Sequence, residues 1–209
     1  MPEIAIFIPS LNRHHKLEPL IENIKENTVI PYTVYFMVSD DESVKILERL
    51  KQKYFRDEGD TRYVTRMNFL YKHSTEPYMF MGSDDIWFHK DWDTELMKAV
   101  KDSPFVVCDD MLNPNGTMAF IDRNYIDEQS GCMDTPGVLF YPAYQHNYAD
   151  TEQFETAKKR GVFSRCMTSK VEHQHYVNGK SQIDDTYTRS NRHSDGDAQL
   201  FYSRRNLWL

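Results

Sequence analysis

An unbroken apolar run near the start of the chain, Ile4-Ala5-Ile6-Phe7-Ile8, most constrains what this sequence can fold into. A strand with one solvated face alternates apolar and polar residues, whereas a strand covered on both faces is apolar throughout. The run stops at Pro9-Ser10. We therefore interpret it as a strand of a parallel sheet with both faces buried.

Further strand and helix patterns alternate along the first half of the chain. Strands are expected at residues 32–38, 63–64 and 78–81, and helices over residues 17–24, 44–50 and 67–72. Such an alternation predicts a Rossmann-like α/β fold, in which a mostly parallel central sheet lies between helices in a three-layer α/β/α sandwich.

Polar clusters follow three of the predicted strands, at residues 9–13, 39–41 and 83–85. In open parallel sheets, ligands bind beyond the carboxyl ends of the strands. Because parallel strands end at the same edge of the sheet, we expect these three clusters to form one rim and to hold the functional site.

The second half of the chain is less regular. We expect strands at residues 105–108, 118–121 and 168–176, a short apolar segment at 137–141, and helices over 150–160 and near 198–202.

Composition argues against a membrane-spanning or disulfide-stabilised protein. No apolar run approaches the roughly 20 residues that a membrane helix needs. The N-terminus has no basic region of the kind that begins a secretory signal, and three cysteines are too few for a disulfide framework. We expect a single domain in a reducing compartment, the cytoplasm, with no membrane partner.

Charge is distributed unevenly. Residues 1–157 carry 15 Lys and Arg against 27 Asp and Glu, whereas residues 158–209 carry 10 against 5. An acidic body with a basic C-terminal region suits a site where a metal and cations meet phosphates. On charge alone, an ordinary solvated surface explains the pattern equally well.

Asp84 and Asp85 directly follow a predicted buried strand. Hard divalent cations prefer oxygen ligands such as these carboxylates. A metal held there could bridge two phosphates of a nucleotide and neutralise the leaving group. A solvated turn is the competing interpretation, since aspartate pairs are common in turns.

Two histidines, His173 and His175, flank Gln174 on a predicted strand. Residues two apart on a strand point to the same face. Both rings could therefore face one site, as metal ligands or as donors to phosphate, although a partly exposed strand with chance histidines is the alternative.

Asp150 is a candidate general base, because a carboxylate can remove the proton of an acceptor hydroxyl. The same residue, with Gln153 three positions later, matches a helix capping box. The two roles are compatible.

Trp87 and Trp92 follow the aspartate pair. Core packing is the favoured explanation for these two aromatic side chains, and stacking on a sugar is the alternative.

Taken together, these residues resemble the family-2-like glycosyltransferases with the GT-A fold, in compact versions such as those of bacteriophages. The resemblance extends from Ile4 to about Phe201. It rests on residues 6–13 as the first strand and nucleotide loop, 38–43 as the acidic motif after the second strand, 66–68 as the Arg-Asn segment, 80–85 as the Asp-X-Asp region, 146–152 as the acceptor segment, and His173 and His175 as the C-terminal histidine motif. Leu11 stands where an aromatic residue is usual, and Gly82 where the first aspartate is common.

The resemblance implies a role for each matching residue. Asp150 would be the catalytic base, and Asp84, Asp85, His173 and His175 would hold Mn²⁺ or Mg²⁺. Contacts to the nucleotide-sugar would come from Pro9, Ser10, Asn12, Arg13, Asp40, Arg66, Asn68, Ser83 and Asp84, and contacts to the acceptor from His146, Trp87 and Glu152. Residues 1–110 would form the donor half of the domain and residues 111–209 the acceptor half.

The implied activity is metal-dependent transfer of a sugar, with inversion, from a nucleotide-sugar to an acceptor hydroxyl, with a UDP-sugar favoured as donor. One acceptor class is 5-hydroxymethylcytosine in phage DNA, contacted through a basic groove that includes Arg189, Arg192, Arg204 and Arg205. A saccharide or glycolipid is the other acceptor class. A sugar nucleotidyltransferase is disfavoured because residues 9–13 contain no glycine, and a non-catalytic binding module is the last alternative.

Overall fold

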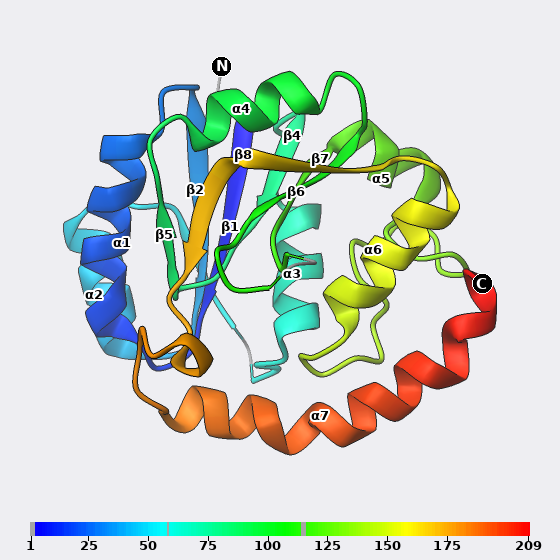
Figure 1. Ribbon diagram of the computed structural model, residues 1–209. Coiled ribbons are helices and arrows are strands. Elements are labelled where there is room, and N and C mark those ends of the chain that lie inside the picture. Colours follow the sequence, from blue (N-terminus) through cyan, green and yellow to red (C-terminus); the bar gives the residue numbers. More distant parts are fainter. Residues whose placement is uncertain (1–2, 58, 114–115) are drawn as a thin grey trace.

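The computed structural model describes residues 3–57, 59–113 and 116–209, which fold around one curved sheet with helices on both faces (Figure 1). The sheet has eight strands in the order β3-β2-β1-β4-β7-β6-β8-β5. Their bounds are β1 Ile4–Ser10, β2 Tyr32–Val38, β3 Tyr54–Arg56, β4 Tyr78–Met81, β5 Ile86–Phe88, β6 Phe105–Asp109, β7 Ala119–Asp122 and β8 Phe163–His173.

The sheet is mostly parallel, as the sequence predicts. Strands β3, β2, β1 and β4 run in one direction, β7 is antiparallel to both of its neighbours, β6 and β8 are parallel, and β5 is antiparallel to β8. In register, Ser10 lies opposite Val38, and Phe7 lies opposite Met81. The polar segments after β1, β2 and β4 therefore meet at one edge, which confirms the predicted rim.

Seven α-helices and two short 3-10 helices complete the fold within the described residues. They are α1 His14–Asn27, α2 Asp41–Arg49, α3 Tyr63–Lys72, α4 Trp92–Ala99, α5 Arg123–Gln129, α6 Ala149–Lys159, η1 Tyr176–Asn178, α7 Asp185–Arg204 and η2 Arg205–Leu207.

Both faces of β1 are buried, which confirms the interpretation of its apolar run. Ile4, Ile6 and Ile8 pack in a core with α1, α2 and α4. Ala5 and Phe7 point the other way, into a second core with α3, α5 and α6. The central strand therefore has no solvated face, as a parallel strand between two helical layers requires.

Several expected elements differ in the structure. Residues 63–64 begin helix α3 and form no strand, because Val64 packs with Met67 and Leu70 on one helical stripe of the second core. The short apolar segment at 137–141 lies in irregular structure. Strand β8 runs over 163–173 and ends before Gln174, so the prediction that 174–176 continue it is wrong. The short element β3, together with β5, α4 and α5, was not expected.

The largest difference is α7, which extends over 20 residues where only 198–202 were expected to be helical. Its first half is rich in polar residues and has no apolar stripe, so the periodicity that reveals a helix is missing there. The Asp184 side chain caps its start by accepting a hydrogen bond from the Tyr187 backbone amide. The helix passes along the edge of the sheet where β1 ends (Figure 1).

No helix in the described part of the chain combines the length and the apolar character needed to cross a membrane.

Candidate active site

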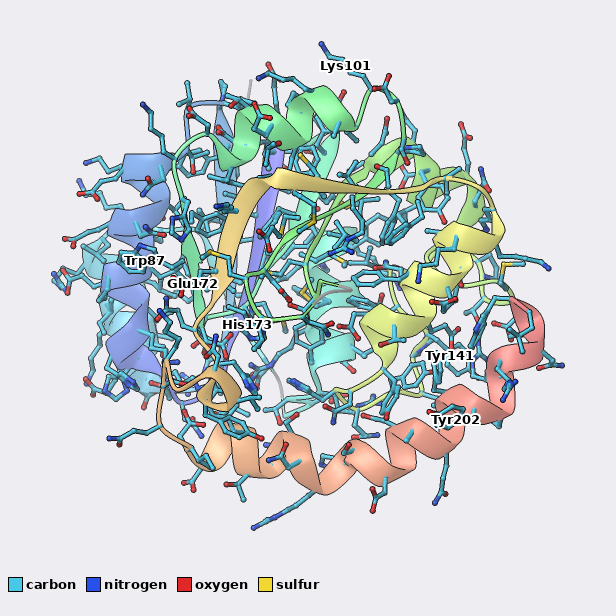
Figure 2. The ribbon with its side chains drawn as sticks, viewed as in Figure 1. Trp87, Lys101, Tyr141, Glu172, His173 and Tyr202 are labelled. Atoms are coloured by element: carbon cyan, nitrogen blue, oxygen red, sulfur yellow. The ribbon has the colours of Figure 1, made fainter. Side chains whose placement is uncertain are left out.

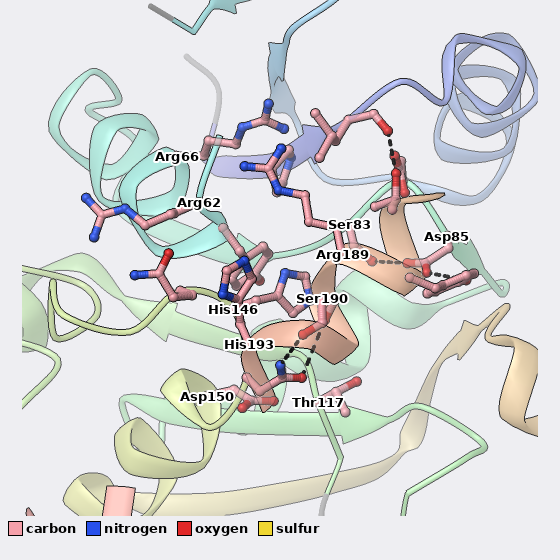
Figure 3. A pocket seen from close by; sticks show the side chains of 18 of the residues that line it. Arg62, Arg66, Ser83, Asp85, Thr117, His146, Asp150, Arg189, Ser190 and His193 are labelled. Atoms are coloured by element: carbon pink, nitrogen blue, oxygen red, sulfur yellow. Dashed lines mark hydrogen bonds between the residues drawn. The ribbon is translucent and has the colours of Figure 1, made fainter. Parts of the chain in front are cut away.

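A cleft of about 330 Å³ opens at the carboxyl ends of β1 and β4. The nucleotide loop and the aspartate pair form one side of it, the segment from Gln145 to Asp150 another, and α7 lies across it (Figure 3). A volume of this size is within the range of small-molecule sites. The cleft also brings together segments from both ends of the chain.

Arg13 is the ionic centre of this cleft. Its Nη1 donates to Asp84 Oδ1 at 2.8 Å and to Asp85 Oδ2 at 3.4 Å, while its Nε and Nη2 donate to the two carboxylate oxygens of Asp184 at 2.7 and 2.9 Å. The residue is only 3% exposed. Burial alone would lower the pKa of Arg13, but these three carboxylates raise it, so the guanidinium stays charged.

Asp84 is fully engaged by protein groups. One oxygen accepts from Arg13 and the other from the Ser10 hydroxyl at 2.8 Å. Burial and the neighbouring charge of Asp85 raise the pKa of this carboxyl despite Arg13. Asp84 therefore holds Arg13 and the nucleotide loop in place, whereas Asp85 is the carboxylate that lies beside His173.

Asp85 lies next to the predicted histidine. Its Oδ1 accepts from the Ser83 hydroxyl at 2.5 Å and lies 3.5 Å from His173 Nε2, and its Oδ2 accepts from the Tyr187 hydroxyl at 2.7 Å. Burial alone would raise the pKa of Asp85, but His173 and Arg13 hold it well below its ordinary value. The carboxylate is thus ionised, as a metal ligand must be, while the same contact raises the pKa of His173 against its burial, so a bound cation would have to displace the His173 proton.

The chemistry of this pair fits a divalent cation. Two ligand atoms at right angles on Mn²⁺ or Mg²⁺ lie about 3 Å apart, given metal–ligand distances of about 2.1 Å. Asp85 Oδ1 and His173 Nε2, at 3.5 Å, are close to that separation. No group of three or more His, Cys, Asp or Glu side chains that could hold a metal occurs among the described residues. The pair would therefore need further oxygens from a bound phosphate or water.

Hydrogen bonds on the side of His173 away from Asp85 fix the orientation of its ring. Its backbone amide donates to Asp110 O at 3.0 Å, and its Nδ1 lies 3.4 Å from the Thr117 hydroxyl, which in turn donates to the buried Asp110 carboxylate at 2.9 Å. A polar group on the second ring nitrogen fixes ring orientation at metal sites. These contacts direct Nε2 of His173 toward Asp85.

His175 reaches the cleft in a different way from the one expected. It lies beyond the end of β8, where its Nδ1 accepts from the Val177 backbone amide at 3.3 Å. Its ring centre is 5.0 Å from that of His173 and 4.7 Å from that of Tyr187. The two histidines therefore come together through a turn and not through strand alternation.

Asp150 faces the cleft from the side opposite Asp85 (Figure 3). It is the second residue of α6, and its Oδ1 accepts from the Thr151 amide at 2.8 Å. The expected capping box is wrong, because the residue before the helix is Tyr148, with a φ of 62°, and Gln153 instead donates to Leu139 O at 2.8 Å. Burial raises the pKa of Asp150, which suits a general base.

Four of the predicted contacts to the nucleotide-sugar do not line the cleft. Asp40 caps α2 by accepting from Ser43, and Asn68 bonds the backbone of Leu139 and Phe140. Asn12 has a φ of 56° in the turn after β1. Ser10 reaches the cleft only through its bond to Asp84.

Two of the residues predicted to contact the acceptor, Trp87 and Glu152, also lie outside the cleft lining. Trp87 lies on β5, the last strand of the sheet, opposite Glu172, and does not line the cleft (Figure 2). Glu152 is 1% exposed and binds Tyr144 and Arg204 inside the protein. The other predicted residues, Pro9, Arg13, Arg66, Ser83, Asp84, Asp85, His146, Asp150, His173 and His175, all line the cleft.

Helix α7 supplies several cleft residues that sequence reasoning missed, among them Tyr187, Ser190 and His193, and it also places Arg189 in the cleft. Arg189 was expected only in a DNA groove. The one usable sequence signal was Asp184 as a helix cap. Arg204, expected in the same groove, is buried and paired with Asp134 and Glu152, so that part of the prediction is wrong.

Comparisons with known proteins agree with this architecture. The family model described as "Glycosyl transferase family 2" matches residues 5–168. No curated protein sequence matches the chain.

Solved structures share the fold at low sequence identity. The mannosyltransferase PcManGT from Pyrobaculum calidifontis, in complex with GDP-Man and Mn²⁺, superposes with a TM-score of 0.68 at 14% identity, over 82% of this chain and 56% of that one. TarS of S. aureus gives 0.66 at 10% identity, over 98% and 43%. Its fragment 1-349 in complex with UDP-GlcNAc gives 0.65 at 9%, over 92% and 65%. This chain thus spans about half the length of the first two.

Proposed function

The chain belongs to glycosyl transferase family 2, and we propose that it moves a sugar from a nucleoside-diphosphate donor to an acceptor hydroxyl with the help of a divalent cation. The observation that carries the proposal is the pairing of Asp85 with His173 at 3.5 Å, on the opposite side of the cleft from Asp150. A metal-binding pair facing a carboxylate base is the minimum that such a transfer needs.

The donor nucleotide would bind between the nucleotide loop and α3. Within the described part of the chain, Arg66 Nε and Thr61 Oγ1 are buried without a hydrogen-bond partner, although both residues line the cleft. Buried polar atoms rarely remain unpaired, so a ligand that supplies acceptors is expected there. The other nitrogens of Arg66 bond Ser10 O at 3.0 Å, the Ser39 hydroxyl and Asp57. Pro9 lines the same region.

The phosphates would lie between Arg66 and Arg189. Burial lowers the pKa of Arg66, and the positive charge of Arg189 adds to that effect. Two guanidinium groups that face one cleft repel each other until an anion lies between them. A diphosphate is such an anion, and arginine is well suited to its geometry.

The cation would be held by Asp85 and His173, with Asp84 and His175 beside them and the remaining ligands from the diphosphate. When bound, Mn²⁺ or Mg²⁺ would neutralise the charge that develops on the nucleoside-diphosphate leaving group. Similar structures carry GDP-Man with Mn²⁺ and UDP-GlcNAc, which supports a nucleotide-sugar with either base. UDP-sugars are the first donors to test.

Asp150 would act on the acceptor. Its carboxylate would accept the proton of the acceptor hydroxyl as the oxygen attacks the anomeric carbon, from the side opposite the leaving diphosphate. One displacement of this kind inverts the anomeric configuration. His146, which also lines the cleft, would contact the acceptor. Residues 1–110 would then form the donor half and residues 111–209 the acceptor half, with His173 reaching back to the donor side.

A saccharide is the acceptor class that fits this surface better. Hydroxymethylcytosine in DNA requires a basic groove, and one of the four arginines expected there, Arg204, is buried in an ion pair. Arg192 and Arg205 are exposed, so salt-sensitive binding to duplex DNA is the measurement that would restore the DNA acceptor.

A thermal-shift screen of UDP, GDP and their sugars, with and without Mn²⁺, tests the proposal. We expect a nucleotide-dependent rise in melting temperature that Mn²⁺ enlarges, and slow Mn²⁺-dependent hydrolysis of the matching nucleotide-sugar. Binding without any hydrolysis or transfer would favour a non-catalytic binding module. Release of pyrophosphate from a nucleoside triphosphate and a sugar phosphate would indicate a nucleotidyltransferase.

A further inference from the structure

A buried carboxylate on α7 binds three consecutive backbone amides, those of residues 145–147, where the acceptor segment 146–152 begins. Asp197, 2% exposed, accepts from Gln145 N at 2.9 Å through Oδ1, and from His146 N at 2.9 Å and Asn147 N at 2.8 Å through Oδ2. Hydrogen bonds to an ionised acceptor are stronger than those between neutral groups. None of the catalytic or ligand-binding roles described above uses Asp197.

The bound segment leads directly to the proposed base. After Asn147 the chain turns through Tyr148, whose φ of 62° is left-handed, and enters α6 with Asp150 as its second residue. Residue 148 is not glycine, so this conformation costs free energy that the surrounding contacts must offset. Asn147 Nδ2 also donates to Ser190 O on α7 at 2.9 Å.

The other end of α7 is bonded to the metal side of the cleft. Asp184, which caps the helix, binds Arg13, and Tyr187 donates to Asp85 at 2.7 Å. The Arg13 guanidinium also lies 4.0 Å from the Tyr187 ring centre. One helix therefore contacts the metal-binding carboxylate near its start, through Tyr187, and the segment before the base farther along, through Ser190 and Asp197.

We propose that Asp197 is a positioning residue, through which α7 holds the segment 145–147 and thereby sets where the Asp150 carboxylate stands relative to Asp85. The inference rests on the proposed function. A general base must lie within hydrogen-bond reach of the proton that it accepts. A displacement of about 1 Å at a catalytic group can reduce the rate about a hundredfold.

Asp197→Asn tests this role, because asparagine keeps the shape but places an NH₂ group against at least one backbone N–H. We expect hydrolysis of UDP-GlcNAc or GDP-mannose in Mn²⁺ to slow about ten- to a hundredfold. The Kd for UDP or GDP with Mn²⁺ should change less than about twofold, with one nucleotide bound per chain. Asp195→Asn, at an exposed position on the same helix, is the matched control and should leave both quantities unchanged.

Amide hydrogen exchange separates positioning from general stability. In the Asn variant, residues 145–147 should exchange faster while the amides of β1 stay protected. If Asp197→Asn does not fold, Asp197→Glu, which keeps the charge but moves the carboxylate by one methylene, should give the same slower hydrolysis with unchanged nucleotide binding. An unchanged rate in the folded variant, or losses of rate and binding in equal proportion, would overturn the inference. Failure of the wild-type protein to bind either nucleotide would instead overturn the proposed function.

Discussion

Asp85 Oδ1 lies 3.5 Å from His173 Nε2, although the two residues come from different halves of the chain. The contact depends on where β8 ends. His173 N donates to Asp110 O, and the next amide, Gln174 N, donates to Asp85 O at 2.7 Å. The end of β8 is thereby joined to the loop that carries the aspartate pair, and the histidine ring is brought to the carboxylate.

This geometry predicts that His173→Ala weakens Mn²⁺ binding to the protein–UDP complex by at least about tenfold, since even residues that only orient metal ligands contribute tenfold or more. His175→Ala should weaken it much less, because Nδ1 of His175 accepts from the Val177 amide, which places the proton of the neutral ring on Nε2. Calorimetric titration of Mn²⁺ into each complex measures both. Equal losses in the two variants would mean that both histidines bind the metal.

The rim of the sheet was predictable from sequence, whereas the closure of the cleft was not. Apolar runs that end in polar residues identify β1, β2 and β4, and parallel strands must end at the same edge. Helix α7 has no such pattern. It is held across the cleft by hydrogen bonds between Asp197 and backbone amides and between Tyr187 and Asp85. Such contacts depend on tertiary structure and leave no period in the sequence.

Arg13 is predicted to stabilise the fold as well as the site. Arg13→Met should lower the free energy of unfolding by about 3 kcal/mol, because it leaves Asp84 and Asp85 buried without their cation. Arg49→Met removes the exposed pair with Glu18, and should change stability little. Urea unfolding of the two variants makes the comparison, and similar losses in both would show that Arg13 contributes no more than a surface ion pair.

Asp150→Asn should slow transfer or hydrolysis about 10²- to 10⁴-fold, the usual contribution of general base catalysis, while nucleotide binding stays intact. Because burial raises the pKa of Asp150, the wild-type rate should decline with falling pH at a higher pH than an exposed aspartate, with its ordinary pKa of about 3.9, would give. Rates in a pH series, with nucleotide affinity measured at each pH, test this expectation. A near-normal rate in the Asn variant would remove Asp150 from the mechanism.

The same pKa shift has a consequence for stability. The folded protein binds the Asp150 proton more tightly than the unfolded chain does, so the ionised carboxylate costs stability, and that cost grows as pH rises through the folded pKa. Asp150→Asn should therefore melt at a higher temperature than the wild type at neutral pH. The difference should shrink as pH falls from the raised pKa of folded Asp150 toward the ordinary aspartate value, and it should be absent below that value. A lower melting temperature at neutral pH would contradict the burial argument.

Individual contact residues were harder to predict than the rim. Glu152 looks like an acceptor contact because it follows Asp150 by two positions, but on a helix that spacing turns it toward the interior, where Arg204 and Tyr144 bind it. The predictions that Asn68 contacts the donor and Trp87 the acceptor were wrong for the same reason, since proximity in sequence to a site does not fix the direction of a side chain.

Gly82 stands where the family commonly has an aspartate, and the structure predicts that Gly82→Asp cannot restore that ligand. A Cβ at this position would lie 2.8 Å from Ile8 Cδ1, 2.9 Å from Phe7 O and 3.2 Å from Ile86 Cδ1. The Phe7 carbonyl cannot retreat easily, because it belongs to the central strand and accepts from Gly82 N at 3.0 Å. The substitution should lower the free energy of unfolding by more than about 3 kcal/mol, through overpacking and an unpaired buried carboxylate.

The control is Gly196→Asp, which makes the same chemical change where an added Cβ would meet no described atom within 4 Å. This variant should have nearly the same stability as the wild type. Urea unfolding of both variants, with Mn²⁺ titration of any that fold, decides the matter, and a stable Gly82→Asp protein with tighter Mn²⁺ binding would show that the position can serve as a ligand.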